Sequence, residues 1–404
     1  MNVDRSAERR REPVLLYGIT IGRSASSFLR GQLSWFRQQG WRVILVTSPD
    51  EAAHQTIERE GVEFHPITMK RDISLFADVR ALMQWIAAIR RYRPDVVNVS
   101  TPKAGLLGGL AAWALRVPRR LYVVRGLRAE GATGIMGSIL RRLEWLSIHL
   151  ATDVVFVSES LAAESERLGL ARGKRSWVIG AGSSNGVPAD AVAARSSAID
   201  RPVLRTEIGF TETDFVVGFV GRITRDKGVD TLLGALASDR IDPSVKLFII
   251  GPLEEPEWGR QIDILGGRVK RLPWTDDVWG HLAVIDVLAL PTLREGFPNV
   301  VLEAAAASVP AITTRATGAV DSVIHGQTGF LIDAGDSADL VARINELARD
   351  PALAAKLGSV ARDRAVSKFH PETIWRGLQE ILEGASDRQY ATRIDVDETE
   401  RVAK

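Results

Sequence analysis

Residues 287–307 read VLALPTLREGFPNVVLEAAAA and carry the strongest fold signal in the chain. Val287–Leu290 is a short apolar run that predicts a buried strand, and Asn299–Ala307 has the composition of a helix. The turn residues Gly296 and Pro298 stand between them and predict a loop. A strand followed closely by a helix is the repeating unit of a doubly wound α/β sheet.

The same alternation runs along most of the chain in two series. The continuous Val, Ile and Leu character of the runs is typical of parallel strands that are covered on both faces. The first series of predicted strands comprises Val14–Tyr17, Arg42–Thr47, Glu63–Ile67, Asp95–Val99, Leu121–Val124, Asp153–Val157 and Ser176–Ile179. The second comprises Phe215–Val220, Val245–Ile250, Arg268–Arg271, Val287–Leu290, Ala311–Thr313 and Phe330–Ile332. Predicted helices include Ser26–Gln39, Ser74–Tyr92, Gly137–Leu150, Gly228–Leu236, Asn299–Ala307 and Ser337–Arg349.

Residues 185–213 interrupt the alternation with a stretch rich in Pro, Ala, Ser and Asp. The chain therefore predicts two Rossmann-like domains facing a cleft, which also suits a length of 404 residues. We expect a disordered N-terminus at 1–12, an acceptor-binding domain at 13–200 and a nucleotide-sugar-binding domain at 201–370. A helix at 371–386 is expected to pack back on the first domain, and 387–404 to be a frayed, charged tail.

Composition narrows the function classes. The chain has no cysteine, which excludes disulfides, thiolate metal sites and cysteine nucleophiles and fits a reducing cytoplasm. The charged N-terminal residues do not resemble a signal peptide. The longest apolar passages, 104–115 and 300–312, are shorter than the ~20 residues of a membrane span. We expect a cytoplasmic protein, located at most at the inner face of the cell membrane.

The net charge of +2 hides an asymmetry between the two halves. Residues 1–200 hold 28 Lys+Arg against 19 Asp+Glu, whereas the remainder holds 24 against 31. A basic N-terminal half indicates either an anionic partner or simply an arginine-rich solvated surface. Aromatic residues are not interleaved with the basic ones on a predicted strand, so the sequence predicts no nucleic-acid binding.

Two glutamates flank the loop of the opening stretch. Glu295 follows the carboxyl end of a predicted strand, and Glu303 lies about two turns into the next helix. The free N–H groups at the start of that helix suit a diphosphate or sugar oxygens. The alternative is a capped helix with one buried and one exposed glutamate.

A second loop, GRITRDKG at 221–228, follows the first strand of the second series. Gly221 permits close approach of a ligand to the backbone. Arg222 and Lys227 are suited to phosphate oxygens and would neutralise a departing diphosphate. The alternative is a surface loop with solvated cations.

Together these two loops and the segment 314–329 closely resemble family four of the retaining glycosyltransferases. The resemblance covers residues 13–383 and implies the GT-B fold, catalysis without a metal, no cofactor and a nucleotide-sugar donor. UDP is the preferred nucleotide because similar bacterial enzymes mostly use it. The segment STPKAGLLG at 100–108 is similar to bacterial members that build capsule, O-antigen and lipid-linked glycans.

The resemblance also implies roles for individual residues. Arg222, Lys227 and Glu295 form the catalytic set: the two cations hold the donor diphosphate and Glu295 holds the transferred sugar. Glu303 binds the ribose, and Gly22 lies in the N-domain loop that closes over the diphosphate. The remaining donor-binding positions are Gly221, Gly296, Phe297, Pro298 and Asn299.

The chain departs from the family pattern at two places. Many relatives carry a histidine after the strand equivalent to Leu121–Val124, where it contacts the transferred sugar. This chain has Arg125 and Arg128 in that segment, so either an arginine replaces the contact or the donor sugar differs. Ser308 stands where glycine is usual, and we expect only local repacking there.

The acceptor is expected to be a saccharide or a polyprenyl-diphosphate-linked glycan. Lys103, Arg125 and Arg128 follow neighbouring predicted strands and form the predicted acceptor site. The segments 104–115 and 135–150, with Trp113 and Trp145, either rest on an anionic membrane or are helices buried in the domain.

Two other enzyme classes share this type of fold. An NAD-dependent enzyme would need a G-x-G-x-x-G fingerprint after the first strand, where the chain has GITIGR at 18–23 instead. A nucleotide-sugar epimerase remains the closer alternative.

Overall fold

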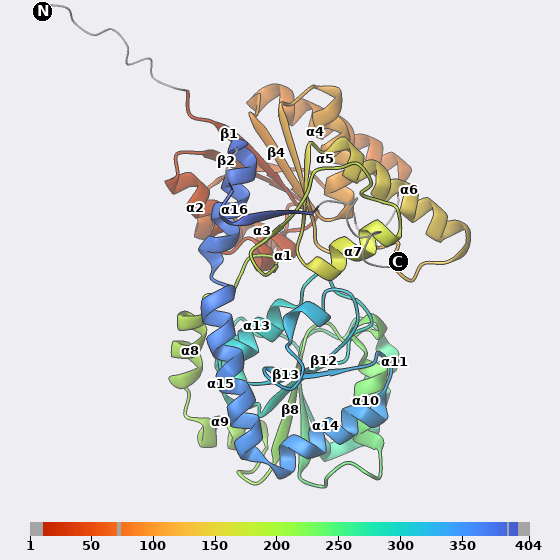
Figure 1. Ribbon diagram of the computed structural model, residues 1–404, viewed down its shortest axis with the longest axis vertical. Coiled ribbons are helices and arrows are strands. Elements are labelled where there is room, and N and C mark those ends of the chain that lie inside the picture. Colours follow the sequence, from red (N-terminus) through yellow and green to blue (C-terminus); the bar gives the residue numbers. More distant parts are fainter. Residues whose placement is uncertain (1–10, 71–73, 386–387, 395–404) are drawn as a thin grey trace, which may run out of the picture.

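The computed structural model describes residues 11–70, 74–385 and 388–394, which form two α/β domains stacked along the long axis of the molecule (Figure 1). Each domain is built on one sheet. The N-terminal sheet has the order β14-β7-β6-β5-β4-β1-β2-β3, and the C-terminal sheet has the order β10-β9-β8-β11-β12-β13. The predicted pair of doubly wound, Rossmann-like domains is therefore confirmed.

The N-terminal sheet is parallel except for its last strand, β14, which pairs antiparallel with β7. Its central strands β1 and β4 are fully buried and mainly apolar because helices cover both faces, as the Val, Ile and Leu runs predict. The strands are β1 (Val14–Gly18), β2 (Arg42–Thr47), β3 (Glu63–Pro66), β4 (Val96–Ser100), β5 (Arg119–Val124), β6 (Asp153–Phe156), β7 (Ser176–Ile179) and β14 (Ala391–Ile394).

The C-terminal sheet is entirely parallel among the described strands. It consists of β8 (Phe215–Val220), β9 (Val245–Ile250), β10 (Val269–Leu272), β11 (Val287–Leu290), β12 (Ala311–Thr314) and β13 (Gly329–Ile332). Its helices are α9 (Arg201–Ile208), α10 (Val229–Ala237), α11 (Pro256–Leu265), α12 (Val278–His281), α13 (Asn299–Ala306), α14 (Ser337–Arg349) and α15 (Pro351–Lys368).

Helices α1 to α8 belong to the first part of the chain. They are α1 (Gly22–Phe28), α2 (Gln32–Gln38), α3 (Glu51–Glu60), α4 (Leu75–Tyr92), α5 (Pro102–Ala114), α6 (Gly134–Leu150), α7 (Glu159–Arg167) and α8 (Ala189–Ser197). Within this set, α4 contacts α5 and α5 contacts α6, so the three form one layer of the N-terminal domain (Figure 1).

The chain passes between the domains twice, and the two passages touch each other. Val187 donates its N–H to the carbonyl of Phe369 (2.8 Å), and a side chain at Gly186 would collide with Phe369 and Pro371. After the second passage, α16 (Pro371–Glu383) returns to the N-terminal domain and contacts α2 and β7 (Figure 1).

Three expectations about individual segments are wrong. The predicted helix at 26–39 is two helices, because Gly31 has a left-handed φ of 77° between them. The stretch at 185–213 contains α8, which consists largely of small residues, and α9, which is only eight residues long. Ala391–Ile394 is a strand rather than part of a frayed tail; the expectations for residues 1–10, 386–387 and 395–404 lie outside the described residues.

A cleft-facing cavity and its charged pair

The loop at 291–298 connects β11 to α13 and lies at the carboxyl end of the C-terminal sheet. Its shape is fixed by backbone contacts: Glu295 donates its N–H to the carbonyl of Thr317 (2.9 Å), and Thr292 donates its hydroxyl to the carbonyl of Arg294 (3.1 Å). Gly296 is required by packing, because a Cβ there would lie 2.2 Å from the carbonyl oxygen of Arg125 in the other domain.

A cavity of about 170 Å³ opens beside this loop and is lined by both domains. It brings together several residues predicted from separate motifs, namely Lys227, Glu295, Gly296, Phe297, Pro298, Asn299 and Arg125. Phe28 and Ser184 of the N-terminal domain also line it, and sequence reasoning did not select either of them. Ligands of doubly wound sheets bind at this edge, so the cavity is the candidate active site.

Lys227 and Glu295 form an ion pair inside the cavity, although 68 positions separate them in sequence. Both side chains are mostly buried, with exposed fractions of 18% and 12%. Lys227 reaches the site because Gly228 follows it with a φ of 71° and packs against Pro291, where a Cβ would lie 1.8 Å from the carbonyl oxygen. The pair presents one positive and one negative group to a ligand in the same small space.

Arg222 occupies a different position from Lys227. Its guanidinium donates to Glu254 (2.8 Å) and lies 3.5 Å from Asp226. Burial alone would raise the pKa of Asp226, but the Thr224 hydroxyl and the charges of Arg222, Lys227 and Arg294 outweigh burial and lower it. The loop after β8 is therefore a cationic environment that stabilises negative charge.

The two predicted glycines lie at the carboxyl ends of the first strands of the two sheets. Gly221 has a φ of 154° and donates its N–H to Ile250 (2.9 Å). Gly22 is the first residue of α1; its N–H donates to Asp50 (3.0 Å), and a Cβ would lie 1.9 Å from that carboxylate. The Gly22 amide is thus engaged by Asp50 in this state.

Glu303 lies in the middle of α13, beside Trp279, which no sequence motif indicated. Burial raises the pKa of Glu303, and a hydrogen bond from Trp279 and the charge of Arg30 partly offset this increase. Arg30 of the N-terminal domain lies 5.5 Å from the Trp279 ring, and Arg23 lies 5.9 Å from the Trp274 ring. Two arginine–indole contacts therefore join the domains on this side of the cleft.

The three cations predicted for the acceptor have three different environments. Lys103 pairs with Asp78 (2.7 Å). Arg125 lines the cavity, donates to the carbonyl of Ser184 (2.8 Å) and lies 4.9 Å from the Phe28 ring, and burial lowers its pKa. Arg128 is exposed, and its backbone N–H donates to Glu144 (2.5 Å).

Further contacts hold the two domains together around the cavity. Ser158 donates its hydroxyl to the carbonyl of Gly296 (2.9 Å). Ser160 hydrogen bonds to the Asp321 carboxylate through its hydroxyl and accepts from the N–H of Gly318 (2.7 Å). The bonded residues lie about 140 to 160 positions apart in sequence, so no local sequence pattern predicts these bonds.

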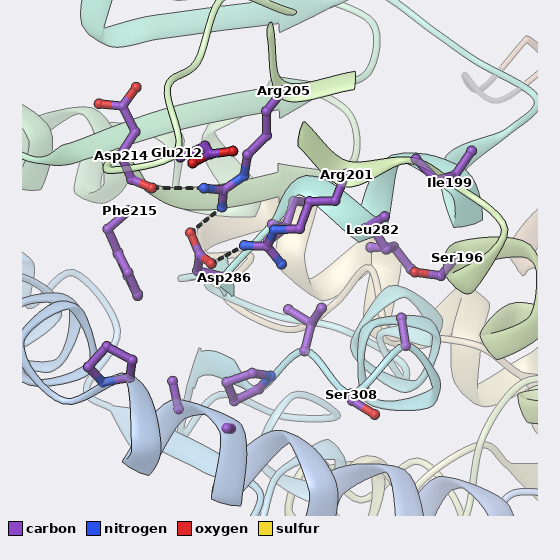
Figure 2. A pocket seen from close by; sticks show the side chains of 18 of the residues that line it. Ser196, Ile199, Arg201, Arg205, Glu212, Asp214, Phe215, Leu282, Asp286 and Ser308 are labelled. Carbon is purple, nitrogen blue, oxygen red and sulfur yellow. Dashed lines mark hydrogen bonds and ion pairs between the residues drawn. The ribbon is translucent and has the colours of Figure 1, made fainter. Parts of the chain in front are cut away.

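A larger cavity of about 800 Å³ lies on the opposite edge of the C-terminal sheet (Figure 2). Three of its charged groups pair with one another: Asp286 pairs with both Arg201 and Arg205, and Arg205 also donates to the carbonyls of Asp214 (3.1 Å) and Val284 (3.0 Å). This edge holds the amino ends of the strands, where doubly wound folds do not place their ligands. We therefore assign the cavity a structural role despite its size.

Comparisons with known proteins agree with this architecture. The profile of the group 1 glycosyl transferases matches residues 200–364, and that of the glycosyl transferase 4-like domain matches residues 25–179. In structure, the chain is similar to Anabaena HepE in complex with UDP and glucose, with a TM-score of 0.76, 23% identity, and coverage of 92% of this chain and 100% of that one.

Two curated relatives are similar over most of their length. The capsular polysaccharide biosynthesis glycosyltransferase CapM of Staphylococcus aureus is 34% identical over 371 residues, which is 90% of this chain and 95% of CapM. An Escherichia coli galactosyltransferase, described as UDP-Gal:alpha-D-GlcNAc-diphosphoundecaprenol alpha-1,3-galactosyltransferase, is 27% identical over 67% of this chain and 70% of its own. From its two matched domains and its similarity to CapM, the chain belongs to the family-four-like glycosyltransferases of GT-B fold.

Proposed function

We propose that the chain transfers a hexose-type sugar from a UDP-linked donor, with retention of configuration, to a saccharide or polyprenyl-diphosphate-linked acceptor in cell-surface polysaccharide synthesis. The observation that carries the proposal is the ion pair of Lys227 and Glu295 in a cavity at the start of α13. The role of CapM in capsular polysaccharide biosynthesis supports the cell-surface pathway, and the activity of the diphosphoundecaprenol galactosyltransferase supports the acceptor class.

The roles follow from the chemistry of the cavity. Lys227 lies where it can neutralise the diphosphate as the bond to the anomeric carbon breaks. Glu295 accepts hydrogen bonds from hydroxyls of the transferred sugar. The amides near Phe297 and Asn299, at the positive end of α13, face the sugar and phosphate oxygens. Arg222 reaches the diphosphate after leaving Glu254.

Retention is proposed without a glycosyl-enzyme intermediate. The acceptor hydroxyl attacks the anomeric carbon on the face from which UDP leaves, and its proton passes to the departing phosphate oxygen. Glu295 is already paired with Lys227, which makes it a poor nucleophile but a good positioning group for the sugar. Catalysis then depends on charge stabilisation and orientation rather than on a carboxylate pair.

The test has two stages. A thermal-shift screen of nucleotide-sugars identifies the donor, because a ligand that binds the folded state raises Tm. The selected donor is then incubated with a synthetic polyprenyl-diphosphate saccharide, and mass spectrometry and NMR define the product and its anomeric configuration. An inverted product would disprove retention, whereas epimerised donor formed without acceptor would replace transfer by epimerase activity.

A further inference from the structure

Helix α4 carries large apolar side chains on its outer face as well as its inner face. Its inner residues, including Trp85 and Ile89, are buried in the domain. Its outer residues include Phe76, the most exposed large apolar side chain among the described residues, with an exposed fraction of 95%. Leu75, Val79 and Met83 are also exposed, and their spacing of three to four residues keeps them on the same side of the helix.

The neighbouring helices extend this apolar face. Trp113 is exposed on α5, and α6 exposes Ile135, Met136, Ile139 and Trp145. Because α4 contacts α5 and α5 contacts α6, these side chains belong to one layer of the N-terminal domain (Figure 1). We call the exposed apolar residues of the three helices the α4–α6 surface. Several large exposed apolar side chains on adjacent helices indicate an interaction site rather than ordinary surface variation.

The charge around the α4–α6 surface is strongly positive. The three helices carry six Lys+Arg (Arg80, Arg90, Arg91, Lys103, Arg141 and Arg142) against two acids (Asp78 and Glu144). Arg80, Arg128 and Arg142 are exposed. On these helices the acids are neutralised or hidden, since Asp78 pairs with Lys103 and Glu144 is buried. Bulky apolar and tryptophan side chains bordered by arginines fit the interface of a bilayer that contains anionic lipid.

The position of the surface relative to the cleft has a functional consequence. Helix α4 follows β3 and helix α6 follows β5, so both begin near the carboxyl edge of the sheet. The same edge holds Arg125, which lines the cavity. Residues at the first turns of the two helices, such as Phe76 and Ile135, therefore lie on the cleft side of the domain. None of the described helices is long and apolar enough to span a membrane, so the contact would be interfacial.

We propose that the α4–α6 surface rests on an anionic bilayer and brings the cleft to a lipid-linked acceptor, an inference that builds on the proposed function. A second copy of this chain is a poorer occupant, because a two-fold contact would oppose two arginine-rich rims without acidic partners. The proposal goes beyond the segments 104–115 and 135–150 selected from the sequence, because the most exposed large apolar side chain, Phe76, lies on α4.

Vesicle sedimentation of the full chain tests the proposal. Vesicles of phosphatidylcholine with phosphatidylglycerol should bind the protein, vesicles of phosphatidylcholine alone should bind it less, and added salt should weaken the binding. The variants Phe76→Ser and Ile135→Ser should each reduce the partition coefficient about tenfold, since each removes a large side chain from the lipid. The matched control is Ile264→Ser on α11, because Ile264 and Ile135 are both 83% exposed.

The outcomes separate this surface from the catalytic proposal. The proposed membrane contact would be overturned if the wild type and the α4–α6 variants bound vesicles equally, or if the protein did not bind anionic vesicles. The proposal would also be overturned if the protein did not bind vesicles and instead formed a concentration-dependent dimer that Phe76→Ser dissociates. Transfer to a short-chain, water-soluble acceptor should be equal in all four proteins. If the wild type bound vesicles but did not transfer sugar to the soluble acceptor, the proposed function would be refuted while the proposed membrane contact would still hold.

Discussion

Lys227 and Arg222 are both positively charged residues of the loop after β8, but their side chains occupy different positions relative to the cavity. Lys227 is already inside the cavity, whereas Arg222 pairs with Glu254 and Asp226 outside it. Removing one group that stabilises a departing charge commonly lowers turnover ~100- to 1000-fold. We therefore expect Lys227→Ala to lower kcat by that amount and Arg222→Ala to lower transfer by less. Steady-state kinetics at saturating donor, with circular dichroism to verify folding, checks this; near-normal turnover of Lys227→Ala would remove its leaving-group role.

Ser308 has a left-handed backbone with a φ of 61°, which explains why glycine is usual there. It follows the C-terminus of α13, where its N–H bonds to Ala305 (2.9 Å) and the N–H of Val309 bonds to Ala304 (2.9 Å). This is the Schellman arrangement, which favours glycine after the last helical residues. The expectation of local repacking alone thus missed a backbone cost.

We predict that Ser308→Gly stabilises the C-terminal domain by roughly 0.5–1 kcal/mol, since relief of left-handed strain exceeds the added chain entropy. Ser308→Ala keeps the strain and serves as the control. Denaturant unfolding of the three proteins measures the difference. Because Ser308 lines the larger cavity, away from the cleft (Figure 2), transfer activity should not change.

Strands and motif loops were predictable because their signals are local. Val287–Leu290 is a continuous apolar run, and the loop that follows carries Glu295 and Gly296 in adjacent positions. Trp279 and Arg30 could not be predicted, because their meeting depends on how two domains pack. Likewise β14 is only four residues long and depends on pairing with β7, which a charged C-terminal sequence does not reveal.

The buried carboxyl of Glu144 on helix α6 holds the loop that carries Arg125 in place. Glu144 accepts from the N–H groups of Arg128 (2.5 Å) and Ala129 (3.3 Å). Burial raises its pKa from an ordinary 4.5 to about 7, and these backbone bonds only partly oppose the increase. A raised pKa stabilises the folded protein fully below about 4.5, and this stabilisation is lost as pH rises through about 7.

In the wild type, the free energy of unfolding should therefore decrease between pH 4.5 and about 7, by an amount on the order of 3 kcal/mol at most. Glu144→Gln should remove this decrease. The measurement is the unfolding free energy of wild type and variant across that range. Glu63→Gln is the control: its ion pair with Arg42 lowers the Glu63 pKa, so its linked change lies at more acidic pH. Identical slopes for wild type and Glu144→Gln would show that Glu144 titrates normally.

The arrangement of the two domains depends on a few polar contacts beside the double passage at Val187 and Phe369. Ser160 is the most connected of them, because it bonds to both the Asp321 carboxylate and the Gly318 N–H. Hydrogen bonds to charged groups contribute ~1.5–3 kcal/mol, so losing Ser160 should shift the population toward an open form. The closed form brings Arg125 against Gly296 and completes the cavity, so opening should weaken donor binding.

We expect Ser160→Ala to raise the radius of gyration in solution scattering and to increase the donor KM about tenfold, with a smaller effect on kcat. Saturating UDP should return the radius toward the wild-type value, because a ligand that contacts both domains favours the closed form. Ser138→Ala, on the exposed side of α6, should change neither quantity. A radius and KM equal to those of wild type would mean that the Arg23–Trp274 and Arg30–Trp279 contacts hold the domains together without the Ser160 bonds.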